Sequence, residues 1–107
     1  MYLDELGEII AVRDLDIVEE RETERKVRVT IGKPQAFPDS GGYYCPFQIT
    51  GIGGEEIKYA AGVDAMQSLQ LVMVIIGATL QFLNGETGNR LHWKGGSEGD
   101  LGFPTAV

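Results

Sequence analysis

The stretch from Asp64 to Gly85, DAMQSLQLVMVIIGATLQFLNG, constrains the fold of this chain more than any other segment. It is long, carries no charge after Asp64 and repeats apolar side chains at helical spacing. Asp64 followed by Gln67 is typical of a capping box at a helix N-terminus. Asn84 and Gly85 favour the left-handed conformation that ends helices. The sequence therefore predicts one helix over Asp64–Gly85.

The predicted helix has two apolar faces. The wider face is expected to pack on a sheet and contains Met66, Leu69, Val72, Met73, Ile76, Leu80 and Leu83. A second row on nearly the opposite side contains Leu71, Ile75, Ala78 and Phe82. Leaving the three large side chains of this row in water would forgo roughly 5–8 kcal/mol, which is comparable to the stability of a whole domain. We therefore expect something to cover the second row.

Two coverings of this second row are open. The C-terminal tail could fold over the helix and supply Trp93, Leu101 and Phe103. Alternatively, a second copy of the chain could pack its own row against the first in a homodimer. Two-fold pairing is the commonest arrangement among soluble oligomers, which favours the homodimer.

The residues on either side of the helix predict β-strands. Four strands are expected before it, at Glu8–Val18, Arg25–Lys33, Tyr43–Gly51 and Glu56–Gly62. In the first, the alternation of apolar residues changes phase, and a bulge near Arg13 and Asp14 would reconcile the two halves. In the third, Pro46 has no N–H to donate, which places the strand at a sheet edge or puts a bulge there.

After the helix, Thr87–Trp93 predicts a short strand, and Lys94–Val107 an irregular tail. The fold class expected is α+β: a four-stranded antiparallel meander, one long helix packed on one face, a short C-terminal strand and the tail. All 107 residues form a single domain in this interpretation, with residues 1–7 and about 95–107 as mobile ends.

Charge and composition exclude several classes of function. The net charge of −7 makes nucleic acid and anionic membrane surfaces poor partners, because both are bound through clustered Lys and Arg. The acidic start MYLDELGE lacks the positive charge of a signal peptide, and the single cysteine, Cys45, fits a reducing compartment. The longest strictly apolar run, Leu71–Ala78, is far shorter than the ~20 residues of a membrane span. We expect a cytoplasmic protein with no membrane partner.

No motif in the sequence predicts a catalytic residue, a cofactor or a metal site. His92 is the only histidine, and no pattern supplies the carboxylate and pocket that an acid–base role needs. One Cys and one His cannot complete a four-ligand zinc site. The ligand-binding hypothesis that remains is a cleft between the helix and the tail, lined by Tyr44, Tyr59, His92 and Trp93.

Three classes of function stay open. The first, which we favour, is a non-enzymatic protein-interaction or binding domain, whose acidic charge would suit neutralisation of a basic partner protein. The second is an enzyme or small-ligand binder that uses the cleft described above. The third is a structural subunit of a larger assembly.

Three short motifs carry a family resemblance. They are Cys45-Pro46-Phe47, Ala61-Gly62-Val63-Asp64 with Gln67, and Leu101-Gly102-Phe103-Pro104. Over Lys26–Pro104 the chain resembles a family of small uncharacterised bacterial proteins with a domain of unknown function. The resemblance implies a sheet-then-helix domain in the bacterial cytosol and brings no known activity or catalytic residue.

Overall fold

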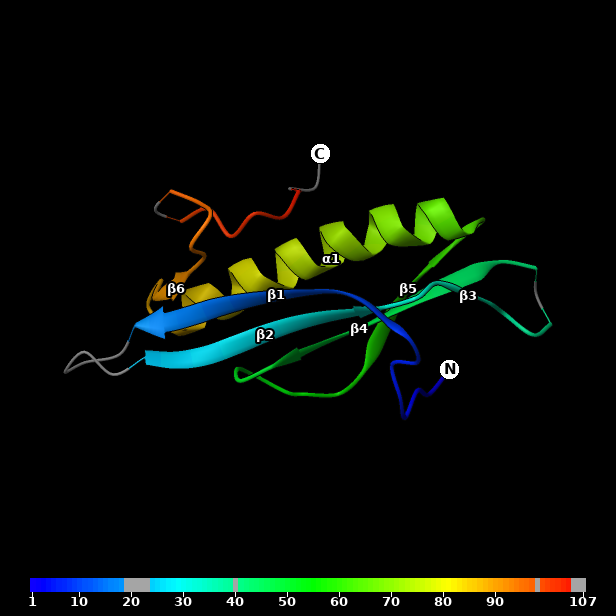
Figure 1. The fold of residues 1–107 in the computed structure, drawn as a ribbon, viewed down its shortest axis with the longest axis horizontal. Helices are drawn as coiled ribbons and strands as arrows, with labels where there is room; N and C mark the ends of the chain where they lie inside the picture. Colours follow the sequence, from blue (N-terminus) through cyan, green and yellow to red (C-terminus); the bar gives the residue numbers. More distant parts are fainter. Residues whose placement is uncertain (19–23, 40, 98, 105–107) are drawn as a thin grey trace.

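A computed structural model describes residues 1–18, 24–39, 41–97 and 99–104. The elements are β1 (Ile9–Val18), β2 (Glu24–Gly32), β3 (Gln35–Ala36), β4 (Tyr43–Thr50), β5 (Lys58–Gly62), α1 (Ala65–Glu86) and β6 (Leu91–His92). Figure 1 shows α1 lying across one face of the sheet, with the C-terminal segment on the helix side and the N-terminus on the other side. The predicted α+β class is confirmed.

The sheet is an antiparallel meander in which β1 pairs with β2, β2 with β4, and β4 with β5. β3 pairs with β4 beyond the end of β2, and β6 pairs with the free side of β1. β5 and β6 are therefore edge strands of the described sheet, as is the two-residue β3. β6, which follows the end of α1, pairs with Asp16 and Ile17 of β1. The segment after the helix thus joins the same sheet as the first strand.

The phase change in β1 has a different cause from the one predicted. The register from Ala11 to Val18 is continuous, and the irregularity lies between Ile9 and Ala11 rather than near Arg13. Arg13 thus has the same inward orientation as Leu15 and Ile17. The predicted bulge was wrong, because a charged side chain occupies an inward position and finds partners there.

β4 is an internal strand, so of the two alternatives predicted from Pro46, a sheet edge or a bulge, the edge was wrong. Ile31 pairs with Phe47, and Gln35 pairs with Tyr44. Between these two pairs, the chain from β2 to β3 advances four residues, whereas β4 advances three. This irregularity lies opposite Pro46, at a point where a missing N–H costs no ladder hydrogen bond.

The core lies between the inner face of the sheet and a second layer. Its buried side chains come mainly from β1, β2 and β4 and meet Val72, Ile76 and Leu80 of α1. The helix packs over β4 and β5, while the C-terminal tail packs over β1 through Arg13. The second layer is therefore half helix and half irregular chain.

The N-terminus of α1 is capped as predicted. The Asp64 carboxylate accepts a hydrogen bond from the Gln67 N–H at 2.8 Å, and the Gln67 side-chain oxygen accepts one from the Val63 N–H at 2.7 Å. The first turn is nevertheless less buried than expected. Met66, predicted for the core face, is 68% exposed, because it lies beyond the part of the helix that the tail covers.

The helix continues past its predicted stop and ends at Glu86. The left-handed residues are Gly88 and Asn89, a few residues later than the predicted pair. Asn84 instead stays helical and buried, and its side-chain oxygen accepts a hydrogen bond from the Leu91 N–H at 2.9 Å. This bond fixes β6 against the end of the helix.

Candidate functional site

The main candidate for a functional surface is the second apolar row of α1, here named the apolar flank: Leu71, Ile75, Ala78 and Phe82. Leu71 and Ile75 are each 39% exposed, Phe82 is 68% exposed, and Ala78 is exposed as well. Only six of the 22 helix residues are fully buried, and ten are exposed. A row of this size on a helix already packed on a sheet is typical of a binding surface.

The described residues of the C-terminal tail, which end at Pro104, do not cover the apolar flank. It packs on the other flank of α1, where a Cβ on Gly77 would come within 2.8 Å of the Pro104 carbonyl oxygen. Leu101 is buried and Phe103 is half-buried at the same side of the core. The covering by Trp93, Leu101 and Phe103 that the sequence left open is therefore not what the structure has.

The apolar flank faces the β5 edge of the sheet. Thr79 and Phe82 line a pocket of about 150 Å³ together with Lys58, the first residue of β5. β5 pairs with β4 on its inner side, and no described strand pairs with its outer side. One side of the molecule thus presents both an apolar helix flank and an open strand edge.

A second candidate is the tail pocket, a cavity of about 270 Å³ between the sheet, α1 and the tail. Its lining includes Ala11, Val29 and Ile31 from the sheet, Met73 from α1, and Phe103 and Pro104 from the tail. Arg13 also lines it and is the only charged residue to do so among those that the structure describes. This is a cleft between helix and C-terminal segment, although none of the predicted lining residues forms it.

Arg13 is held by the tail. Its guanidinium carbon lies 4.1 Å from the centroid of the Trp93 ring and 4.8 Å from that of Phe103. Its Nη1 donates hydrogen bonds to the carbonyl oxygens of Gly102 at 2.8 Å and Leu101 at 3.4 Å. The sequence did contain a signal for this role, since Arg13 shares its strand parity with Leu15 and Ile17.

The four residues predicted to line a ligand cleft are not brought together. Tyr44 and Tyr59 pack against Phe37 with centroid distances of 5.1 and 6.2 Å, on the sheet face that carries Pro46. His92 is exposed on β6 opposite Asp16, and Trp93 lies on Arg13. β1 and β2 separate the two pairs in the sheet.

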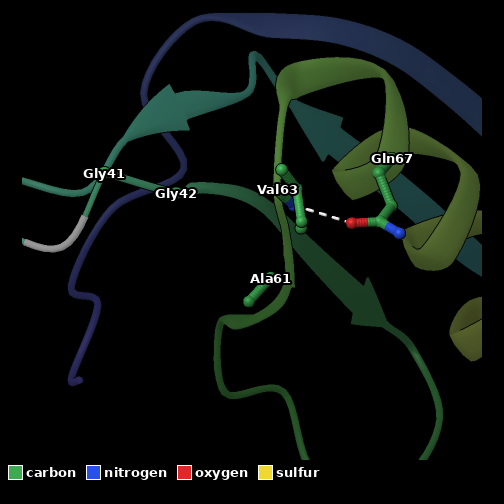
Figure 2. Close-up of a pocket in the computed structure, with 6 residues that line it drawn as sticks. Gly41, Gly42, Ala61, Val63 and Gln67 are labelled. Atoms are coloured by element: carbon green, nitrogen blue, oxygen red, sulfur yellow. Dashed lines mark hydrogen bonds between the residues drawn. The ribbon is translucent and has the colours of Figure 1, made fainter.

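Figure 2 shows a third, open pocket where the β3–β4 loop meets the start of α1. Gly41, Gly42, Ala61 and Val63 line it, so it offers backbone and methyl groups. Its one long polar side chain, Gln67, already accepts the hydrogen bond from Val63 that the figure marks. The pocket lacks the converging polar groups of a ligand site.

The remaining chemistry of the described residues is modest. Cys45 is fully buried, and burial raises the pKa of its thiol to about 11, so the unreactive neutral form dominates near neutral pH. No group of three or more His, Cys, Asp or Glu residues in the described ranges is placed to hold a metal ion.

By length and composition alone, α1 would suffice to cross a membrane. Its caps and its packed face are those of a helix on a sheet.

No curated protein and no solved structure was found to match this chain. A family model described as a domain of unknown function, DUF6968, matches residues 11–105. The match includes β1 from Ala11 onward, the other strands, the helix and the tail residues that hold Arg13. The chain therefore belongs to the DUF6968 family.

Proposed function

We propose that this protein is a non-enzymatic interaction module that acts as a homodimer, formed by the apolar flank and the outer edge of β5. The observation that carries the proposal is the position of both features on one side of the molecule. An apolar flank alone could suit many partners. A flank beside an open strand edge suits a partner that offers the same pair of features.

The two features are similar in length. Leu71 to Phe82 spans eleven helical steps, about 16 Å, and Lys58 to Gly62 spans four strand steps, about 13 Å. A two-fold axis through the β5 edge would continue the sheet from one copy to the next. It would also set the two helices side by side in the layer above, where the small Ala78 permits close approach.

The register of such a pair is restricted by β5 itself. Antiparallel pairing centred on Ala60 uses all five residues and sets Lys58 opposite the partner's Gly62. The two lysines then do not face each other. Within the five residues of β5 and the four of the apolar flank, Lys58 is the only charged side chain, so these two features bring no like charges face to face.

A basic partner protein is favoured less by the geometry. Asp14 and Asp16, on the outer face of β1, are already hydrogen-bonded to Arg28 and Lys26. The hydrogen bond from Arg28 lowers the pKa of the Asp14 carboxyl. These carboxylates are thus part of cross-strand ion pairs and offer little unsatisfied negative charge.

The test is the mass of the protein in solution, measured by sedimentation velocity over a range of concentrations. We expect the wild type at twice the 11.7 kDa of one chain. Phe82→Glu should give the monomer, because it places a charge at the most exposed large side chain of the apolar flank. Met66→Glu is the matched control: Met66 and Phe82 are both 68% exposed on the same helix, but Met66 lies outside the flank.

Two results would overturn the proposal. One is a wild-type monomer at the highest concentration reached. The other is equal behaviour of Phe82→Glu and Met66→Glu, whether both dissociate or both remain dimeric. Binding of the wild type but not Phe82→Glu to lipid vesicles, with a monomer in solution, would assign the flank to a membrane surface instead.

A further inference from the structure

We propose that the tail pocket binds a small monocarboxylate with a hydrophobic body, and that Arg13 is the partner of its carboxylate. The pocket is the cavity of about 270 Å³ between β1, β2, Met73 of α1 and the tail. It lies on the opposite flank of α1 from the apolar flank, so this site is separate from the proposed dimer interface.

The lining of the pocket selects a hydrophobic body. Val29 and Ile31 are 1% and 3% exposed and form an aliphatic floor. Met73 and Phe103 add polarizable apolar walls. The volume equals that of about nine water molecules, which limits the ligand to a small molecule. A strongly hydrated ion without an apolar body would gain nothing from these contacts.

Arg13 provides the one charge in the pocket, and no described carboxylate pairs with it. The ion-paired cations Lys26, Arg28 and Lys58 each have a carboxylate within 3.5 Å. Arg13 instead donates from Nη1 to two carbonyl oxygens, and its Nε and Nη2 make no hydrogen bond to a described residue. An uncompensated guanidinium is unusual in a chain whose net charge is −7.

The guanidinium is also oriented in advance. The rings of Trp93 and Phe103 both contact its carbon, at 4.1 and 4.8 Å from their centroids, which restricts rotation of the group. A planar guanidinium with free N–H donors matches a planar carboxylate in two-point hydrogen bonding. Since no second cation lines the pocket, one negative charge is the best match.

The experiment titrates the full chain with sodium octanoate and measures binding by calorimetry, with Trp93 fluorescence as a local report. Trp93 is the only tryptophan and lies on Arg13. We expect saturable binding of octanoate, binding of 1-octanol that is at least tenfold weaker, and no binding of inorganic phosphate. Arg13→Gln should weaken octanoate binding at least tenfold, whereas Lys33→Gln, which removes one exposed positive charge outside the pocket, should not change it.

A second variant is needed because Arg13→Gln could also release the tail from the sheet and so destroy the pocket. Ala11→Leu should fill the pocket and weaken octanoate binding, while thermal unfolding and Trp93 fluorescence without ligand stay as in the wild type. The proposal is overturned if octanoate gives no saturable signal at millimolar concentration, if 1-octanol or phosphate binds as tightly, or if both pocket variants bind like the wild type. Phe82→Glu should bind octanoate as tightly as the wild type. Octanoate binding therefore tests the tail pocket whether or not the protein forms a dimer.

Discussion

Single residues decide how the two halves of this molecule are joined. Arg13 occupies an inward position of β1 and holds the tail through two aromatic rings and two carbonyl oxygens. Asn84 fixes β6 to the end of α1 with one buried hydrogen bond. In each case a polar side chain is placed where an apolar one would ordinarily pack, and it forms hydrogen bonds with backbone groups of another segment.

At this scale, the pH dependence of stability is predicted from Cys45. Burial raises the pKa of its thiol from 9.0 to about 11, so the stabilising effect is complete below pH 9 and is lost as pH rises toward 11. Across that range the wild type should lose about 2 kcal/mol of unfolding free energy relative to Cys45→Ala. Urea unfolding of both proteins at pH 8 and pH 11 measures the difference. A constant difference between the two proteins would mean that the buried thiol is not the titrating group.

Among the elements, α1 has three roles on three sides. Its core side packs on β4 and β5, its Gly77 side receives the tail, and its apolar flank stays exposed. Because apolar residues lie on several sides of α1, the helix sequence alone does not show which side packs on the sheet, which contacts the tail and which stays exposed. The sheet sets the first side, and the missing side chain at Gly77 sets the second.

Two glycines of α1 test this division. A Cβ on Gly85 would meet nothing within 4 Å, whereas one on Gly77 would come within 2.8 Å of the Pro104 carbonyl oxygen. Gly85→Ala should therefore stabilise the protein by about 0.5–1 kcal/mol through helix propensity. Gly77→Ala should lose that gain and displace the tail, which changes Trp93 fluorescence. Thermal unfolding with fluorescence detection compares the two, and equal stabilisation without a spectral change would contradict the contact.

The whole molecule is a two-layer sandwich whose two sheet edges differ. One edge ends in the two-residue strand β6 and is tied to the helix by Asn84. The other edge, β5, is longer and lies beside the apolar flank. An open edge next to exposed apolar side chains is a hazard in a monomer, because it is a template for pairing with another chain.

Amide hydrogen exchange tests the proposed dimer at this scale. If β5 pairs with a second copy, those of its amides that do not bond to β4 should exchange more slowly as protein concentration rises. Amides of β6, at the other edge, should show no dependence on concentration. The same experiment on Phe82→Glu should remove the dependence in β5. Exchange in β5 that is fast and independent of concentration in the wild type would contradict strand pairing.

The sequence by itself determined the fold class and most of the elements, although it did not predict the two-residue strand β3. Period-two alternation placed the strands, the capping pair Asp64 and Gln67 placed the start of α1, and the spacing of Leu71, Ile75 and Phe82 identified the exposed row. These features depend on neighbours a few residues apart, so local physical chemistry suffices to predict them.

Tertiary structure alone decided which chain segments meet. Arg13 faces inward because a segment about eighty to ninety residues away offers it the rings of Trp93 and Phe103 and the carbonyl groups of Leu101 and Gly102. Pro46 is tolerated in an internal strand because the neighbouring chain is irregular opposite it. The tail lies at Gly77 rather than on the apolar flank because only a residue without a side chain allows so close an approach. Each outcome depends on the shape of a distant partner, and local sequence patterns do not contain that information.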